Sequence, residues 1–276
     1  MNQTTNPARD RRRRPGRGAR PSRAESELPD FGGLVRRVRE QRRLTRSRAA
    51  GLLHVSTELL KKIEHGTVAC SPTVLDHLVT AYDLDHAQQR HTRDLTHPAI
   101  PLSPVTELRA RAGSPEHRAK LAYLDRRNLA SAYLDPLWNV VLANDRFRAE
   151  LPNVEHYRDN IALWFFHPGS STPTAEAFVV QWDCAAAHLV ASLRGAFGRH
   201  RTTPGTFALY QELREVPAFA QIWDTSLSVT YGFRAEQPIL VHDPTTGEPS
   251  TARIHLGAQG SPDLHFFLAY RDGPPA

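Results

Sequence analysis

Residues 44–66 read LTRSRAAGLLHVSTELLKKIEHG, and this stretch decides the fold of the N-terminal part of the chain. Its first half predicts a short helix over 47–53 that is built from small and apolar residues. Its second half predicts another helix, because Ser56 is a good N-cap and Gly66 stands where a C-cap belongs. Leu60 and Ile63 belong to an apolar stripe along that second helix. The stretch therefore predicts two short helices in close succession.

The spacing between these two helices matches that of a helix-turn-helix. A small residue, Ala50, stands where the helices must cross closely; four residues later His54 occupies the turn, and Val55 follows as an apolar plug. His54 has to accept a backbone geometry that favours glycine, at some energetic cost. The second helix then keeps one polar face free, and a helix of this width fits the major groove of B-DNA. The free face consists of Thr57, Glu58, Lys61 and Lys62.

Positive charge is concentrated in the same part of the chain. The net charge is +6, and residues 1–23 alone contain eight arginines against one aspartate. Residues 1–29 are rich in Arg, Pro, Gly and Ser and nearly free of large apolar residues, so we expect a disordered arm. The arm is either a solvated tail without a specific role or a phosphate-attracting segment, with arginine insertion into a minor groove as one option. The asymmetry points to a polyanion as the partner of this region.

Three more helices are predicted around the stretch, at 31–44, 71–84 and 85–95, so that residues 30–96 form an all-α domain of five short helices. The ending KKIEHG followed by SPTVLDHLVTAYDL resembles the Cro/C1-type (XRE-family) helix-turn-helix domains, over about residues 31–95. The resemblance implies binding to double-stranded DNA. Carried over by position, it implies these DNA-binding residues: Arg46, Arg48, Ser56, Thr57, Glu58, Lys61 and Lys62. Among them, Thr57 and Glu58 are the expected base readers, and the basic residues are expected phosphate or groove contacts.

The remainder of the chain has a different character. Residues 97–112 are Pro-rich and predict a linker with a short helix, and residues 113–272 predict an α+β domain. SAYLDPLWNVVLAN contains two short β-type runs, several helical segments follow, and QPILVHD, STARIHL and LHFFLAY return to strands. The sequence thus predicts a multidomain protein, with an all-α domain followed by an α+β domain.

Catalytic and metal-binding patterns are missing from the sequence. It contains no GxSxG, P-loop, GxGxxG or HExxH motif, and its fourteen histidines are scattered. The two cysteines, Cys70 and Cys184, lie far apart without CxxC spacing, so neither a disulfide framework nor a zinc site is implied. No apolar run approaches the length of a membrane span. We therefore expect a cytoplasmic protein that is not an enzyme, has no metal or other cofactor and does not bind a membrane.

Large aromatic residues among small ones mark the second domain, and such a core can leave room for an apolar ligand or can simply be well filled. The ordered segments YLDPLWNVVLANDRFRAEL, NIALWFFHPG, FVVQWDCAAAHLVASLRGAFGRH, LYQELREVPAFAQIWDTSLSV and HDPTTGEPSTARIHL are similar to the MmyB-like ligand-binding domain of actinobacterial regulators. This resemblance implies a PAS-like fold around an apolar pocket and a fatty-acid-like ligand. It implies these pocket residues: Trp138, Asn144, Trp164, Phe165, Trp182, Leu189, Leu193 and Trp223. Asn144 is alternatively a helix N-cap, and its position favours this second interpretation.

The sequence thus favours a ligand-responsive transcription regulator. A single helix-turn-helix reads few base pairs, so we expect a homodimer on a palindromic operator. Two other interpretations stay open: a second domain that only mediates dimerisation or protein contacts, and, less favoured, an enzyme acting on an acyl ligand.

Overall fold

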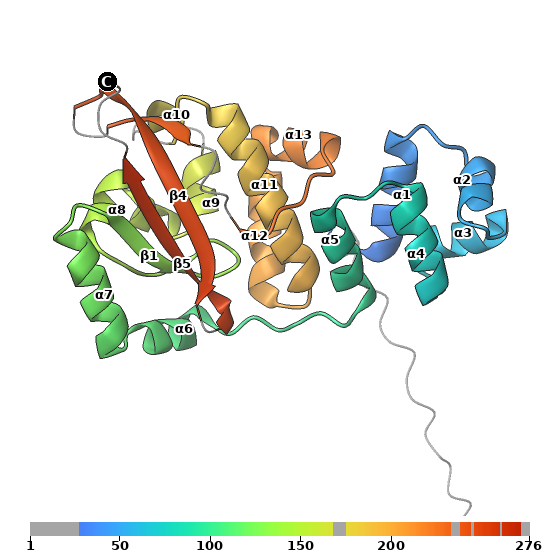
Figure 1. Ribbon diagram of the computed structural model, residues 1–276, viewed down its shortest axis with the longest axis horizontal. Coiled ribbons are helices and arrows are strands. Elements are labelled where there is room, and N and C mark those ends of the chain that lie inside the picture. Colours follow the sequence, from blue (N-terminus) through green and yellow to red (C-terminus); the bar gives the residue numbers. More distant parts are fainter. Residues whose placement is uncertain (1–27, 168–174, 233–237, 244–245, 260, 272–276) are drawn as a thin grey trace, which may run out of the picture.

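The structure is a computed structural model that describes residues 28–167, 175–232, 238–243, 246–259 and 261–271 (Figure 1). The predicted Arg-rich arm lies almost entirely outside these residues. A bundle of five helices comes first in the chain, and a domain of helices and strands follows it. The predicted order, all-α and then mixed α and β, is therefore confirmed. None of the described helices is long and apolar enough to cross a membrane.

The five helices of the first domain all begin with a side-chain cap. They are α1 (Phe31–Gln41), α2 (Arg46–Leu52), α3 (Thr57–Glu64), α4 (Pro72–Ala81) and α5 (His86–Thr96). In each case a side-chain oxygen of the N-cap residue accepts a hydrogen bond from a backbone N–H of the first turn, which satisfies one of the donors that a helix start leaves open. The caps are Asp30, Thr45, Ser56, Ser71 and Asp85.

Helices α2 and α3 meet as the spacing of the sequence predicts. Ala50 and Leu60 are both buried in the core of this domain. His54, in the turn, has φ +54°, so it does occupy the left-handed region that glycine favours. Helix α1 also approaches α3 closely, because a Cβ atom on Gly32 would lie 2.7 Å from the carbonyl oxygen of Ile63. Small residues thus let α3 lie directly against both neighbours.

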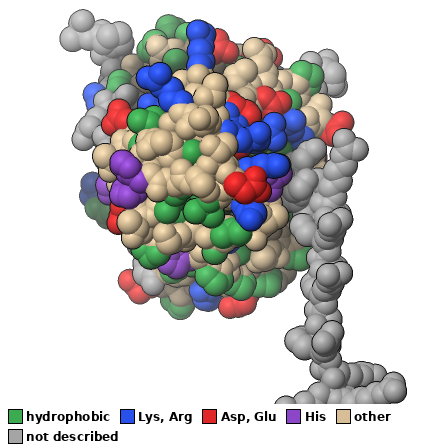
Figure 2. Space-filling model, turned by 90° about the vertical axis from the view of Figure 1, so that its right-hand side faces the viewer, with side chains coloured by type: hydrophobic (Ala, Val, Ile, Leu, Met, Phe, Trp, Pro, Cys, Tyr) green, Lys and Arg blue, Asp and Glu red, His purple; other side chains and the backbone are tan. Residues whose placement is uncertain are grey.

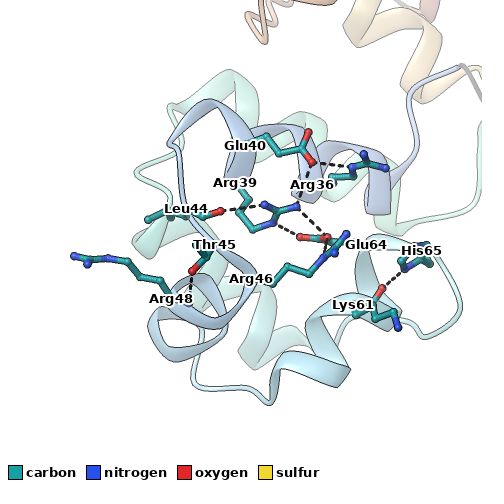
Figure 3. Close-up of polar contacts among 10 residues, drawn as sticks. All are labelled: Arg36, Arg39, Glu40, Leu44, Thr45, Arg46, Arg48, Lys61, Glu64 and His65. Atoms are coloured by element: carbon teal, nitrogen blue, oxygen red, sulfur yellow. Dashed lines mark hydrogen bonds and ion pairs between the residues drawn. The ribbon is translucent and has the colours of Figure 1, made fainter.

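A buried ion cluster ties α1, α2 and α3 together (Figure 3). The Glu64 side chain is completely buried, and its carboxylate accepts hydrogen bonds from Arg39 Nε at 2.5 Å and Arg46 Nε at 2.8 Å. Arg39 also donates to the carbonyl oxygen of Leu44, at the end of the loop that leads into α2. Burial by itself would raise the pKa of Glu64, but the hydrogen bonds from the two arginines hold it below the ordinary value. Glu64 is therefore an ionised structural residue.

The second domain is built on an antiparallel sheet in the order β2-β1-β5-β4-β3. The strands are β1 (Ala130–Leu134), β2 (Val140–Ala143), β3 (Ile239–His242), β4 (Pro249–Gln259) and β5 (Ser261–Arg271). In the central pairings, Ala130 lies opposite Ala269 and Leu134 opposite His265. The N- and C-terminal strand regions, remote in sequence, therefore share one sheet, as Figure 1 shows.

Helices cover both faces of this sheet. On one face, α6 (Val105–Ala112) and α7 (Pro115–Asp125) pack against β2 and β1. The other face carries most of the helices: α8 (Asp145–Glu150), α9 (Ile161–Phe166), α10 (Ala175–Phe178), α11 (Trp182–Arg199), α12 (Pro204–Arg214) and α13 (Pro217–Thr225), with the 3₁₀ turn η2 (Val154–Tyr157). Residues 97–112, for which a linker with a short helix is predicted, contain α6, and its Leu108 and Ala112 are fully buried against the sheet.

The two domains are docked through α5 and α1. Leu227, in the loop after α13, is buried in the core of the helical domain. Arg37 of α1 donates to the carbonyl oxygen of Trp223 at 2.6 Å, at the C-terminal end of α13. This carbonyl also accepts a hydrogen bond from the buried Arg194 of α11 at 2.8 Å. The C-terminal end of α13 therefore binds cationic side chains from both domains, which its helix dipole favours.

A second set of docking contacts surrounds Asp94 of α5. Its carboxylate pairs with Arg199 of α11 and accepts a hydrogen bond from the Tyr231 hydroxyl at 2.8 Å. One turn earlier, His91 packs so closely on α11 that a Cβ atom on Gly198 would lie 2.5 Å from its Cε1 atom. Burial, followed by the charges of Arg194 and Arg201, lowers the pKa of His91 to about 3. The domain boundary thus contains a neutral, buried histidine.

Candidate DNA-binding face and ligand pocket

The face of α3 predicted to meet DNA is open to solvent. Leu60 and Ile63 are buried, and the side chains on the opposite side of the helix are exposed: Thr57, Glu58, Lys61 and Lys62. Helix α3 lies at the end of the molecule remote from the sheet (Figure 1). Figure 2 looks onto that end and shows Lys and Arg side chains gathered over the upper part of the face. The second domain therefore does not cover the face of α3 that is predicted to meet DNA.

The other predicted DNA-binding residues lie at the start of α2 and at the cap of α3. Ser56 accepts a hydrogen bond from the Leu59 N–H at 3.1 Å and so caps α3. Arg46 is partly committed to Glu64 through its Nε, although 38% of its side chain stays exposed. Arg48 is exposed at the start of α2. The structure thus brings all seven predicted residues to α2, α3 and the cap of α3.

An apolar cavity of about 360 Å³ lies between α11, α9 and the sheet. Four of the eight predicted pocket residues line it: Trp138, Trp164, Phe165 and Leu189. Trp138 comes from the β1–β2 turn, the next two come from α9, and Leu189 comes from α11. The cavity falls within the size range of small-molecule sites, and most of its lining is apolar. Burial lowers the pKa of the lining residue His188, so the imidazole adds no charge at neutral pH.

The other four predicted residues lie outside the lining. Asn144 accepts hydrogen bonds from the N–H groups of Phe147 and Ser131, so it caps α8 and braces β1. Trp182 stacks on Phe165 with ring centres 5.4 Å apart and thus supports the wall from behind. Leu193 is a fully buried core residue, and Trp223 lies at the domain boundary beneath the Arg194 guanidinium.

Sequence reasoning missed part of the lining that the C-terminal strands contribute. Ile239 and Val241 of β3 and Ile254 of β4 face the cavity. Their alternation along the strands is the signal that could have identified them, because side chains two residues apart share a face. Which of the two faces is covered by α11 depends on the tertiary structure alone.

Charged residues surround the opposite end of the cavity from Trp138. Arg127, Arg146 and Arg271 contribute to its lining together with Glu150, which pairs with both Arg146 and Arg271. Arg271 also pairs with Asp243, yet its Nε is buried and donates to no described residue. A buried donor without an acceptor is costly, so this end offers a place for an anionic or hydrogen-bond-accepting group. No group of three or more His, Cys, Asp or Glu residues suited to a metal occurs in the described part of the chain.

These two sites define a DNA-binding transcription regulator with a ligand-binding domain. Comparison with known families agrees: residues 30–92 match a helix-turn-helix domain, and residues 105–274 match the MmyB-like transcription regulator ligand binding domain. The chain belongs to the MmyB-like transcription regulators, since the second match covers more than half of it. Both matched families are those of regulators and not of enzymes. A comparison with curated proteins finds no match.

Proposed function

We propose that the protein is a cytoplasmic, XRE-type repressor or activator that binds a palindromic operator as a homodimer and responds to a fatty-acid-like molecule. The observation that carries the DNA-binding part is the exposed polar face of α3 at the end of the molecule remote from the second domain. In this proposal Thr57 and Glu58, in its first turn, read base edges, and Lys61 and Lys62 contact phosphates or guanine. Arg46 and Arg48 add phosphate contacts beside them.

The chain offers a matched test of this face, because it contains only three lysines: Lys61, Lys62 and Lys120. Lys61→Ala and Lys62→Ala should each weaken binding to a duplex selected from a random library. Each should also lower the slope of log affinity against log salt concentration by about 1. Lys120→Ala, on α7 in the second domain, is the control and should leave both quantities unchanged. Wild-type affinity in both α3 variants would refute the assignment.

For the ligand, the supporting observation is an apolar cavity with a cationic end. An acyl chain fits the aromatic and aliphatic walls, and its carboxylate can accept hydrogen bonds from Arg127, Arg146 or Arg271. Glu150 and Asp243 offset two of the three positive charges, and the remaining positive charge keeps this end favourable to an anion. To regulate, such a ligand must bind the DNA-competent and incompetent states with different affinity.

Native mass spectrometry of the purified full chain tests the ligand. A co-purifying mass that fragments as a fatty acid supports the proposal, and its loss in Leu189→Trp, which fills the cavity, locates it. Repeated spectra of ligand-free homodimer would instead favour a second domain that only mediates association. Conversion of an added acyl ester would indicate the enzyme alternative. Spectra showing monomer alone, at concentrations that saturate the operator, would refute the homodimer.

A further inference from the structure

A second cavity, of about 330 Å³, lies beyond the apolar pocket at the domain boundary. The two cavities follow the same face of α11: Ala185 and Leu189 line the apolar pocket, and Ser192, Ala196 and Arg199 line the second cavity. These residues are three or four positions apart, so they lie above one another along a single helix face. One groove beside α11 therefore contains both cavities, end to end.

The strand register gives the same arrangement on the opposite wall. Ala269 and Ile254, which pair with each other, line the apolar pocket. His265 and Ala258 also pair with each other and line the second cavity. Because these two pairs are four residues apart along β5, the cavities lie at successive positions along the same two strands.

Trp138 separates the two cavities and contributes to the lining of both. Its indole N–H donates to Ser192 Oγ of α11 at 3.1 Å, and its backbone is held by hydrogen bonds to Asp135 and Ile161. The backbone has φ +66°, in the left-handed region that a tryptophan rarely adopts. A bulky residue keeps such a conformation only where its surroundings impose it. The ring is thus held by its hydrogen bond to α11 and by the fixed conformation of its backbone.

The second cavity differs in chemistry from the apolar pocket. Its lining includes Arg199, His265 and Tyr231, and also Arg90 of α5, whose guanidinium lies 3.9 Å from the centre of the Tyr231 ring. It therefore receives residues from both domains, whereas all lining residues of the apolar pocket come from the second domain. A molecule that extended past Trp138 would reach the DNA-binding domain.

We infer that Trp138 is the end wall of the ligand pocket and selects apolar ligands by their length. This inference rests on the proposed ligand-binding function. A ligand whose anionic end lies at Arg271 directs its apolar end toward Trp138, and its length is limited by the ring. Longer ligands bind only if the indole gives up its bond to Ser192 and turns aside, which opens the way to the second cavity.

The test is calorimetric titration of the full chain with saturated fatty acids of increasing length: octanoate, laurate, palmitate and behenate. Trp138→Gly removes the wall and suits the positive φ. It should raise the affinity for palmitate relative to laurate by at least about tenfold, because accommodating even one of the additional methylenes of palmitate in an apolar site changes binding by about that factor or more. Ser192→Ala, which frees the ring without creating a large cavity, should shift the preference in the same direction. If Trp138→Gly does not fold, the Ser192→Ala variant still tests the inference.

A further variant shows where the longer ligands go. Ala258→Phe fills the second cavity without touching the apolar pocket, so adding it to Trp138→Gly or Ser192→Ala should restore the wild-type preference. Binding of the acids with the same preference by wild type and by the Trp138 and Ser192 variants would overturn the inference and leave the ligand proposal standing. Failure of every protein to bind any acid would overturn both.

Discussion

Replacement of Glu64 by glutamine should destabilise the helical domain by about 3–5 kcal/mol, the usual consequence of removing one member of a buried ion pair. The Glu64 side chain has no exposed surface, and only 8% of the Arg39 side chain is exposed. Glutamine would leave the Arg39 guanidinium buried opposite a neutral amide. The amide has a single acceptor oxygen for the two arginines that now share a carboxylate. Three helices would therefore lose their common contact.

Hydrogen exchange of amides in α1 and α3 measures this loss, since it reports the opening of the helical domain separately from that of the second domain. Glu40→Gln is the control. Glu40 accepts a hydrogen bond from the same Arg39 at 3.3 Å and one from Arg36, but 48% of its side chain is exposed. The Glu40→Gln substitution should lower the stability of the helical domain by less than about 1 kcal/mol. A loss of stability below about 1 kcal/mol for Glu64→Gln would show that the reasoning from burial is wrong. Equal losses of stability in the two variants would show the same.

Three further predictions concern the domain boundary. The pKa of His91 is lowered to about 3 by burial, so a state in which the domains are undocked binds a proton that the docked state excludes. Docking should therefore weaken as pH falls below about 6.5, by about 2 kcal/mol at pH 5. Hydrogen exchange of α5 should become faster at low pH in wild type but not in His91→Gln. Arg37→Leu, which removes the bond to the Trp223 carbonyl, should increase exchange in α13 and the loop after it, whereas Arg36→Leu, at an exposed site, should not. Gly198→Ala should force α5 and α11 apart and lower the melting temperature, with an overpacking cost of about 1–3 kcal/mol; an unchanged temperature would mean that the boundary yields freely.

Local sequence was sufficient for the helix-turn-helix. Helix periodicity separates Leu60 and Ile63 from Lys61 and Lys62, and these positions depend only on residues within the same helix and its neighbour. The unusual His54 was also predictable, because the turn fixes the sign of φ wherever two helices are joined at this spacing. The order of an all-α and a mixed domain followed from the same short-range patterns.

The pocket residues could be predicted only in part. Trp138, Trp182 and Trp223 are all aromatic residues within or next to helical or strand segments, and composition does not distinguish them. In the structure the first lines two cavities, the second stacks on Phe165 of the pocket wall and the third lies beneath Arg194. Their roles depend on which side of α11 meets the sheet, and that is decided by packing over the whole domain.

From the sequence alone follow the five helices of the first domain, the strand segments of the second domain, the exposed face of α3 and the class of the protein, but not the helices α7 and α9. Hydrophobic periodicity, caps and turn residues act over a few positions and are visible in the chain. Tertiary structure alone decided the contacts between residues remote in sequence, such as Asp94 with Tyr231 and Arg271 with Glu150. These contacts require the sheet to hold the ends of the second domain together and α11 to lie against α5. The domain boundary and the length of the ligand groove are therefore properties of the fold.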